Sequence, residues 1–497
     1  MEVTFEQLHD AALQCRRGKL KGTQAQRFEC DRLGRLYDLQ QALQTYTWQP
    51  SAMRQFIAQN GSKPREIHAP AYADRVVHHW LIAQLRPLIE PKFIFDCAAN
   101  IKGRGTHFAV QRLGRMMRQQ PSSYYLQLDI FNFFYQIDQH ILLAQLHTHL
   151  SIATWRGQLD AEQQRGLYWL CQQLISTPIA LVHTDRPRDE HRLPQHKRLL
   201  SAPLGKGLPI GNLSSQFFSN VYLNALDQFV KHTLKVQHYS RYVDDFVLLH
   251  PCRQQLLAWR AEIATFLNAK LALSLKDSGK LAPVSHGVDF LGYISYAHHR
   301  RVRARVLHQF RVKLQSWWSE STVSRGHGVM LAAPDFAALQ SMVASYWGHC
   351  QHAKVQSKWR EIWLGFSWLR YFFHWQYGMA PRARWRIPKP LPSGVQVTTA
   401  KGQFKWFDAA LPGVLLMQLG NRVLLKADEV PVGYVPLAIP WQRSSALVTL
   451  PLGVLEDICQ SLSASSAWAY VEQCGYRSNH LRQRQLARCF FISKDRL

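Results

Sequence analysis

The spacing of hydrophobic positions changes several times along the 497-residue chain, and each spacing predicts a different kind of element. Apolar residues recur every three to four positions in four segments, which is typical of amphipathic helices. These segments are residues 1–50, 72–88, 142–175 and 214–234. Shorter runs with the character of strands lie at residues 63–70, 124–130, 239–250 and 288–295. Because both kinds of pattern are interleaved, we expect an α+β fold.

The second half of the chain divides at a proline-rich stretch. Residues 302–376 keep helical spacing and are rich in Trp. Residues 381–395 then contain four prolines among Arg and Lys residues, and prolines at that density stop helices and stiffen a connection. We therefore expect a linker there. Beyond it, short strands are predicted up to residue 449, followed by helices at 452–462 and 479–488.

Charge adds a candidate partner to this picture. Lys and Arg number 60 against 33 Asp and Glu, which gives a net charge of +27. A chain this basic favours a polyanionic partner, most simply nucleic acid, over the alternative of a merely soluble basic surface. No apolar run approaches the roughly 18 residues of a membrane span, and the N-terminus lacks the pattern of a signal peptide. Nine scattered cysteines without a C-x-x-C pair are typical of a reducing cytoplasm.

Acidic residues at strand ends supply the candidate chemistry. Asp244 and Asp245 are adjacent in SRYVDDFVLLH, between two apolar runs, and Asp129 ends the alternating run YYLQLD. Phosphoryl transfer by two metal ions needs carboxylates from separate strands that converge on both ions. Each acid taken alone also fits a hairpin turn or a strand-end cap. Between these motifs, GKGLPIGNLSSQ combines glycines with a helix start at Ser214 to Gln216, as expected where backbone approaches a nucleotide.

These motifs, in this order, resemble a reverse transcriptase. The set runs KPREIHAPAYADRVVHH, FDCAANIKGRGTHFAV, LDIFNFF, GLPIGNLSSQ, YVDD and VDFLGY. The resemblance implies a right-hand polymerase of the α+β class with fingers, palm and a helical thumb, followed by a small α+β accessory domain. The domains expected are a helical segment at 1–60, fingers and palm at 61–295, thumb at 296–380, linker at 381–395 and accessory domain at 396–497.

The resemblance also assigns roles to individual residues. Asp129, Asp244 and Asp245 correspond to the catalytic carboxylates, and together with Ile130 they correspond to the metal ligands. Phe134 resembles the steric gate that selects dNTPs. Lys63 and Arg65 resemble the finger residues that grip the triphosphate. Gly211 and Gln216 resemble the residues that touch the nascent base pair. Lys280 is the candidate for the basic residue after the palm, with Lys276 as the alternative.

The form of one motif indicates a subfamily. Ile210 to Gln216 read I-G-N-L-S-S-Q, which is similar to the enzymes of diversity-generating retroelements. These elements copy a template RNA with errors opposite adenine. Bacterial reverse transcriptases of antiphage defence, which make cDNA from a noncoding RNA, stay open as the alternative. Residues 411–425, 467–473 and 481–491 faintly resemble the N-terminal, mismatch-sensing domain of MutS, although Asn421 to Val423 replace its base-wedging residues.

Cofactors and partners follow from the resemblance. The enzyme would use two Mg²⁺ ions, for which Mn²⁺ can substitute. It would bind dNTPs, a template or noncoding RNA, the cDNA and the RNA–DNA hybrid, and the retroelement type adds a small basic accessory protein. Whether the chain is a homo-oligomer stays open. The competing hypothesis from another class is a catalytically silent RNA-binding scaffold, which would have no need of three converging carboxylates.

Overall fold

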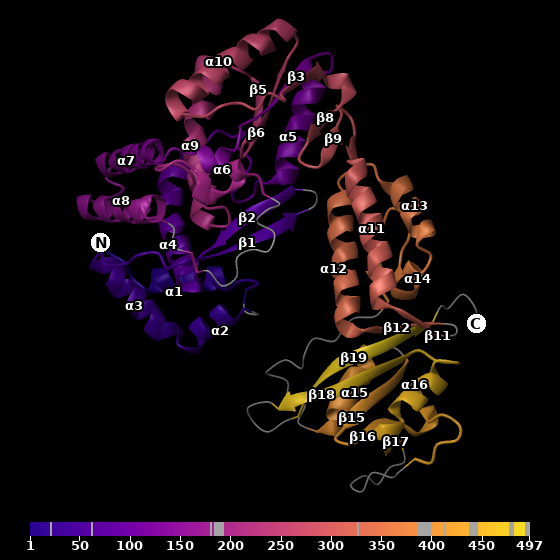
Figure 1. Cartoon of the computed structure of the whole chain (residues 1–497). Helices are drawn as coiled ribbons and strands as arrows, with labels where there is room; N and C mark the ends of the chain where they lie inside the picture. Colours follow the sequence, from indigo (N-terminus) through magenta and orange to yellow (C-terminus); the bar gives the residue numbers. More distant parts are fainter. Residues whose placement is uncertain are drawn as a thin grey trace. The chain divides into compact units, whose positions relative to one another are not determined.

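The structure is a computed structural model of the 497-residue chain. It describes residues 1–19, 22–60, 63–178, 181–182, 193–325, 328–384, 399–411, 413–436, 446–476 and 482–492. The chain forms two compact units (Figure 1). The N-terminal unit comprises Met1–Leu291 and Ser295–His298, and the C-terminal unit comprises Gly292–Ile294 and His299–Leu497.

The N-terminal unit begins with helices and a hairpin. Its first elements are α1 (Phe5–Arg16), α2 (Thr23–Cys30), α3 (Arg32–Gln44), β1 (Met53–Asn60), β2 (Lys63–Ala69), α4 (Tyr72–Ile89) and α5 (Thr106–Gln119). The described part of residues 1–50, whose hydrophobic spacing predicted helix, therefore holds three helices. Strands β1 and β2 pair antiparallel, with Arg54 opposite Ala69 at one end and Asn60 opposite Lys63 at the other.

The rest of this unit surrounds a four-stranded antiparallel sheet. Its elements are β3 (Tyr124–Asp129), α6 (Phe133–Gln136), α7 (Gln139–Trp155), α8 (Ala161–Ser176), β4 (Leu181–Val182), α9 (Leu213–Gln228), β5 (His238–Tyr242), β6 (Asp245–His250), α10 (Arg253–Leu271), β7 (Lys280–Pro283) and β8 (Val288–Phe290). The strand order is β5-β6-β3-β7. A π-helical turn, Phe229–Thr233, extends α9.

The two faces of this sheet differ in character. Leu126 and Leu128 of β3 and Phe246 of β6 belong to the main hydrophobic core, together with buried residues of α4, α9 and α10. Side chains alternate along a strand, so Tyr125, Gln127 and Asp129 lie on the other face. The apolar face therefore fixes the sheet against the helices, and the opposite face is left to carry Asp129.

Local sequence signals set the helix ends in this unit. Asp138 caps α7 by accepting the backbone N–H groups of His140 and Ile141 at 3.0 and 3.1 Å. Asp160 and Gln163 form a capping box at the start of α8, in which side chain and backbone bond reciprocally. The helical segment predicted at residues 142–175 is therefore divided into two helices, because Asp160 starts a new one.

The C-terminal unit combines helices with a large sheet. Its elements are β9 (Tyr293–Ser295), β10 (Arg300–Val302), α11 (Ala304–Ser321), β11 (Val323–Arg325), β12 (Gly328–Ala332), α12 (Ala333–Cys350), α13 (Gln356–Gly365), α14 (Leu369–Phe372), β13 (Phe373–His374), β14 (Arg382–Ala383), α15 (Ala400–Ala410), β15 (Val414–Leu419), β16 (Arg422–Lys426), β17 (Leu447–Pro451), α16 (Leu455–Leu462), β18 (Trp468–Tyr476) and β19 (Arg482–Ile492). The seven-stranded sheet has the order β11-β12-β19-β18-β15-β16-β17.

This sheet joins segments that the sequence assigned to different domains. Strand β12, inside the predicted thumb, pairs antiparallel with β19 near the C-terminus, for example Leu331 with Cys489. The hairpin β11–β12 interrupts the helical pattern predicted for residues 302–376. The division into thumb, linker and accessory domain stays a prediction: residues 385–398 of the linker region lie outside the described residues, and the segments on either side share one sheet.

Several predicted elements need correction. The helix predicted at 479–488 is wrong, since Arg482–Ile492 form β19, and α15 lies in a region predicted to hold only strands. The strand predicted at 288–295 is two strands, β8 and β9, separated by Leu291 and Gly292, which both have positive φ. Residues 187–206, whose polar, basic and proline-containing sequence indicates a loop or hairpin insertion, lie in part outside the described residues, and 195–201 hold two short 3-10 turns. The α+β class itself is confirmed.

Candidate active site

Two carboxylates meet at one edge of the four-stranded sheet, one at the end of a strand and one in a turn. Asp129 ends β3 and pairs in register with Asp245 of β6. Asp244 occupies the two-residue turn between β5 and β6, and its carboxylate lies within hydrogen-bond reach of the Asp129 carboxylate. The backbone N–H of Ile130 donates to the carbonyl of Asp244 at 3.3 Å, which ties the end of β3 to this turn.

The turn itself has an unusual backbone. Val243 has φ +57°, a left-handed conformation that β-branched residues rarely adopt. Such strain persists only where the surrounding structure imposes it, and it is common at functional sites. Here it permits the tight turn that points Asp244 toward Asp129.

Electrostatics in this pair favour a cation. Burial raises the pKa of Asp244 to about 6, and the negative charge of Asp129 adds to that increase. Lys276 opposes it: its ammonium Nζ lies 2.5 Å from Asp129 Oδ2, and its backbone N–H donates to the Asp129 carbonyl at 2.8 Å. The other carboxylate oxygen, Asp129 Oδ1, is buried and accepts no hydrogen bond from a described residue. Two acids this close are stabilised by a bound cation, so the pair fits a divalent metal ion.

Asp245 lies beside this pair and has a different partner. The amide Nε2 of Gln127 donates to Asp245 Oδ1 at 3.1 Å and to the carbonyl of Asp289 at 3.1 Å. Within the described ranges, no group of three or more His, Cys, Asp or Glu side chains is arranged to hold a metal ion. Asp129 and Asp244 therefore supply a two-carboxylate site, whose remaining ligands would be backbone, water or substrate oxygens.

Phe134 follows the catalytic strand at the start of α6. Its ring is half-buried and lies 5.4 Å from the Phe133 ring, centroid to centroid. Its carbonyl accepts the backbone N–H of Leu208 at 2.8 Å. The side chain is thus held by the core on one side, five residues after Asp129.

Gly211 brings the loop before α9 against β2. Its φ is +118°, and a Cβ there would lie 2.9 Å from Ile67 Cγ2 and 3.1 Å from the His68 carbonyl. The backbone N–H of His68 donates to the Ile210 carbonyl at 2.8 Å, so the two segments touch directly. Gln216 lies exposed in the first turn of α9. Only glycine fits both the conformation and the close approach at residue 211.

The predicted basic residues lie on two elements. Lys63 begins β2 and its side chain is outside the described residues, whereas Arg65 on the same strand is exposed. Lys280 pairs with Gln127 across β7 and β3, and its Nζ lies 5.8 Å from the Tyr125 ring centroid. The lysine that contacts Asp129 is Lys276. The structure therefore brings the alternative lysine, rather than the preferred one, to the carboxylates.

A buried ion pair behind the turn was missed by the sequence analysis. Arg241 of β5 is fully buried and donates to both carboxylate oxygens of Asp227 at 2.6 and 2.7 Å. Its Nη1 also donates to the carbonyl of Val243 at 2.9 Å. Tyr239 completes the cluster by donating its hydroxyl to Asp227 at 2.8 Å. The only sequence signal was the Arg immediately before Tyr-Val-Asp-Asp, because nothing in the chain marks its partner 14 residues earlier.

Comparison with known families identifies the domain that contains this site. Residues 57–295 match the family model "Reverse transcriptase (RNA-dependent DNA polymerase)", a range that contains both carboxylates, the turn and Lys276. The chain carries a reverse transcriptase domain. The presence of this domain agrees with the order of the motifs in the sequence.

The reverse transcriptase domain has relatives of low similarity. Protein YkfC of Escherichia coli (strain K12) is 22% identical over 290 residues, which covers 51% of this chain and 67% of that protein. Among solved structures, telomerase from Candida albicans in complex with a fragment of telomeric RNA has a TM-score of 0.36 and 12% identity, and covers 64% of this chain. Apo telomerase from Candida tropicalis has a TM-score of 0.38 and 10% identity over 61% of this chain. The match spans little more than half of either telomerase chain, at 56% and 53%.

No helix within the described ranges of the chain, in the reverse transcriptase domain or beyond it, is long and apolar enough to cross a membrane.

Proposed function

We propose that the whole chain is an RNA-directed DNA polymerase that copies a dedicated template RNA into cDNA. The observation that carries this proposal is the Asp129–Asp244 pair, which meets at the end of β3 and the β5–β6 turn inside the reverse transcriptase domain. A scaffold that only binds RNA gains nothing from two partly buried carboxylates that repel each other at short distance, since placing like charges together is costly.

In this proposal the carboxylates hold two Mg²⁺ ions, with Mn²⁺ as a substitute. Asp129 and Asp244 are the principal ligands, the main-chain oxygen of Ile130 contributes, and Asp245 lies beside them. The ions supply activation of the primer 3′-hydroxyl and stabilisation of charge on the transferred phosphoryl group. The chain's own part is to fix the two acids before substrate binds, through the Ile130–Asp244 backbone bond and the buried Arg241.

The residues around the pair position the incoming nucleotide. Phe134 acts as the steric gate against a ribose 2′-hydroxyl. Lys63, Arg65 and Lys280 would neutralise the triphosphate, and Gly211 with Gln216 would line the nascent base pair. These assignments follow from matched motifs. Gly211 has an additional role in holding the loop against β2.

For the biological context we propose error-prone synthesis in a bacterial diversity-generating retroelement. The I-G-N-L-S-S-Q form of residues 210–216 supports it, because a changed contact to the templating pair alters a selection worth only a few kcal/mol. The partners would be a template RNA, the RNA–DNA hybrid and a small basic accessory protein. Antiphage defence is the second candidate, and the extensive C-terminal sheet is the observation that favours it, since this sheet lies outside the matched polymerase domain.

One experiment separates these contexts. The protein would be purified with its co-expressed RNA, supplied with dNTPs and Mg²⁺, and the DNA product sequenced. We expect heterogeneous copies of one template with errors concentrated opposite adenine. Faithful, repetitive or homopolymeric DNA would favour defence, and absence of DNA would favour the scaffold.

The Asp244→Asn variant tests the site directly. It keeps the shape of the side chain and removes its charge, so we expect DNA synthesis to fall by more than about 100-fold, the scale of losing one key electrostatic group. Binding of RNA without Mg²⁺ should stay within about twofold of the wild type. Equal loss of RNA binding would mean that the carboxylate is structural.

A further inference from the structure

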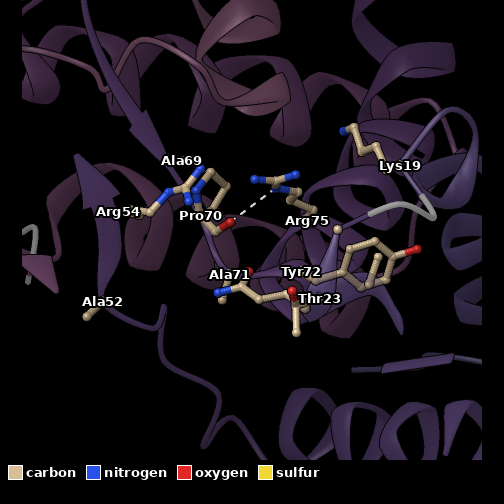
Figure 2. A pocket seen from close by; sticks show the side chains of 12 residues that line it. Lys19, Thr23, Ala52, Arg54, Ala69, Pro70, Ala71, Tyr72 and Arg75 are labelled. Atoms are coloured by element: carbon tan, nitrogen blue, oxygen red, sulfur yellow. Dashed lines mark hydrogen bonds between the residues drawn. The ribbon is translucent and has the colours of Figure 1, made fainter. Parts of the chain in front are cut away.

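A second polar site lies at the base of the β1–β2 hairpin. It is a pocket of about 310 Å³, shown in Figure 2. Four segments line it: the turn after α1, the first turn of α2, the ends of β1 and β2 around Arg54 and Ala69, and the first turn of α4. Arg54 pairs with Ala69 at the end of the ladder opposite Lys63, so the pocket is not part of the triphosphate grip proposed for Lys63 and Arg65.

Three cations from three segments face this pocket. Lys19 follows α1, Arg54 is on β1 and Arg75 is on α4, and Figure 2 shows their side chains around the same space. Arg75 Nε donates to the Pro70 carbonyl at 3.1 Å, which leaves the rest of its guanidinium available, and Arg54 lies 5.4 Å from the Phe56 ring centroid. None of the three cations forms an ion pair with a described carboxylate, and no Asp or Glu lines the pocket.

Two helix N-termini add to this positive potential. The pocket is lined by Gly22 to Ala25, which cap and begin α2, and by Ala71 and Tyr72, which cap and begin α4. Neither N-cap residue supplies a side-chain hydrogen bond. The first N–H groups of a helix have no intrahelical acceptor and carry partial positive charge, so they favour an anion.

The nearby acid does not compensate for these charges. Asp74 lies in the first turn of α4, but its carboxylate is buried and accepts the backbone N–H of Ser51 at 2.9 Å and its hydroxyl at 3.3 Å. Burial, with a smaller contribution from the charge of Lys19, lowers the pKa of His79 to about 4. The lining of the pocket thus carries positive charge without an acidic side chain among its residues, and the carboxylates nearby, Asp74 and Glu29, bond to other partners.

We propose that this pocket binds a phosphate group of a nucleic-acid strand, at a site separate from the Asp129–Asp244 pair. Three cations and two helix N-termini around one cavity match the charge and the acceptor oxygens of a phosphate. The volume admits one phosphate with its attached sugar and leaves the strand free to continue outside. The inference does not depend on the proposed polymerase activity.

The test compares two double variants in a binding assay without Mg²⁺ or dNTPs. Lys19→Gln with Arg54→Gln removes two pocket charges, and both side chains are exposed, so the fold is retained. The control, Arg253→Gln with Lys270→Gln, removes the same charge from exposed positions of α10, at the opposite end of the N-terminal unit from α1 and α2 (Figure 1). The probe is a 20-nucleotide single-stranded RNA with a dye at its 3′ end, titrated at several salt concentrations.

The affinity for RNA falls as salt rises, and each phosphate contact to a single strand contributes roughly 0.7 to the steepness of log affinity against log salt. The pocket variant has lost two contacts, so its slope should be shallower than that of the wild type by about 1.4. At 0.1 M salt the pocket variant should therefore bind RNA about 10-fold or more weakly than the control. A parallel thermal-shift titration with inorganic phosphate and with AMP identifies the source of the phosphate. Stabilisation of the wild type but not of the pocket variant, with unchanged RNA affinity, would assign the pocket to a free phosphate compound. Indistinguishable behaviour of both double variants in both assays would overturn the proposal.

Discussion

Lys276 holds the place beside Asp129 that a metal ion also needs. Its ammonium contacts Asp129 Oδ2, and both side chains are partly exposed. Two cations about 4 Å apart repel each other by roughly 1 kcal/mol in water-like surroundings. The ammonium of Lys276 would therefore weaken the binding of a metal ion at Asp129 by about fivefold. We therefore expect Lys276→Gln to lower the Mg²⁺ concentration that gives half-maximal activity, by about threefold to fivefold. The measurement is a Mg²⁺ titration of primer extension.

Lys270→Gln is the control for that experiment, because Lys270 is an exposed lysine of α10 and is not among the residues proposed to bind the nucleotide or the metal. Its Mg²⁺ requirement should equal that of the wild type. If Lys276→Gln raised the Mg²⁺ requirement, Lys276 would be acting as a support for the metal site and not as a competitor.

His78 makes folding sensitive to acid. Burial lowers the pKa of His78 to about 3, and its Nδ1 lies 3.0 Å from the Ser214 hydroxyl. An unfolded histidine has a pKa near 6.5, so the unfolded chain takes up the proton first as pH falls. The stability that neutral His78 provides is complete above pH 6.5 and is lost between about pH 6.5 and 3, at roughly 1.4 kcal/mol per pH unit.

The variant His78→Gln keeps a hydrogen-bonding group near Ser214 and cannot titrate. Denaturant unfolding between pH 7 and 5 should show a pH slope smaller than that of the wild type by about one proton. His308→Gln, at an exposed position, should leave the slope unchanged. His79 and His149, whose pKa values burial lowers to about 4, account for part of the remaining slope. Equal slopes in all three proteins would show that His78 is charged in the folded state.

The residues of the site differ in how far the sequence alone predicts them. The convergence of Asp129 and Asp244 could be predicted, because each lies within a short run of neighbours whose spacing is itself informative, whereas the role of Phe134 stays a prediction. The order of Lys280 and Lys276 could not be decided from the sequence, because Lys280 begins β7 and Lys276 lies four residues before it, and only the fold shows that Lys276 reaches Asp129. The Arg241–Asp227 pair was missed because its two members lie on a strand and at a helix end.

At the level of elements, the β5–β6 hairpin depends on Arg241. This side chain joins the end of α9, through Asp227, to the carbonyl of Val243 in the turn. Arg241→Met leaves Asp227 buried without its partner, which costs about 3–5 kcal/mol. We expect unfolding at a lower denaturant concentration and a larger loss of turnover than of RNA binding, because the turn carries Asp244.

The double variant Arg241→Met with Asp227→Leu provides the control. Replacing both members of a buried ion pair by apolar residues is often neutral or stabilising, so stability should return toward the wild type. Turnover should stay low, because the bond to the Val243 carbonyl is still absent. Recovery of both stability and turnover would mean that Arg241 does not position the turn.

Elements with a strong local period were predicted best. β3 and α4 have clean alternation or clean helical spacing, and both occur within a residue or two of the predicted bounds. Strand β19 was predicted as a helix because Leu481 to Arg488 are good helix formers. Its strand form depends on distant partners: Arg484 is buried and bonds to Gln403 and to the Gln418 carbonyl. Tertiary pairing of this kind overrides local propensity.

At the scale of the whole molecule, the C-terminal unit should respond as one body. Phe491 of β19 is buried between Phe336 of α12 and Phe372 of α14, with ring centroids 5.1 and 4.9 Å away. Phe491→Ala removes a large core side chain, which costs about 3–5 kcal/mol. We expect faster amide exchange in α12 and in β18, whereas α4 and β3 of the N-terminal unit keep wild-type protection.

If amide exchange increased only in residues 399–492, this prediction would be contradicted. The result would instead support a separate accessory domain at the C-terminus. Trp406→Ala in α15 serves as a control for loss of an aromatic ring, because Trp406 is only partly buried and its ring lies against Phe407 of the same helix.

During synthesis, strand β12 is made well before β19, the strand with which it pairs. Leu331 and Cys489, which face each other in the sheet, are separated by 158 residues. At about 5–20 residues per second, a ribosome needs on the order of 10–30 s to make that stretch. Throughout this interval β12 presents unpaired backbone N–H and C=O groups on the nascent chain, as an exposed strand edge does. The helices that follow it thus emerge well before the strand that completes their sheet, and slower translation would lengthen the time in which a chaperone is needed.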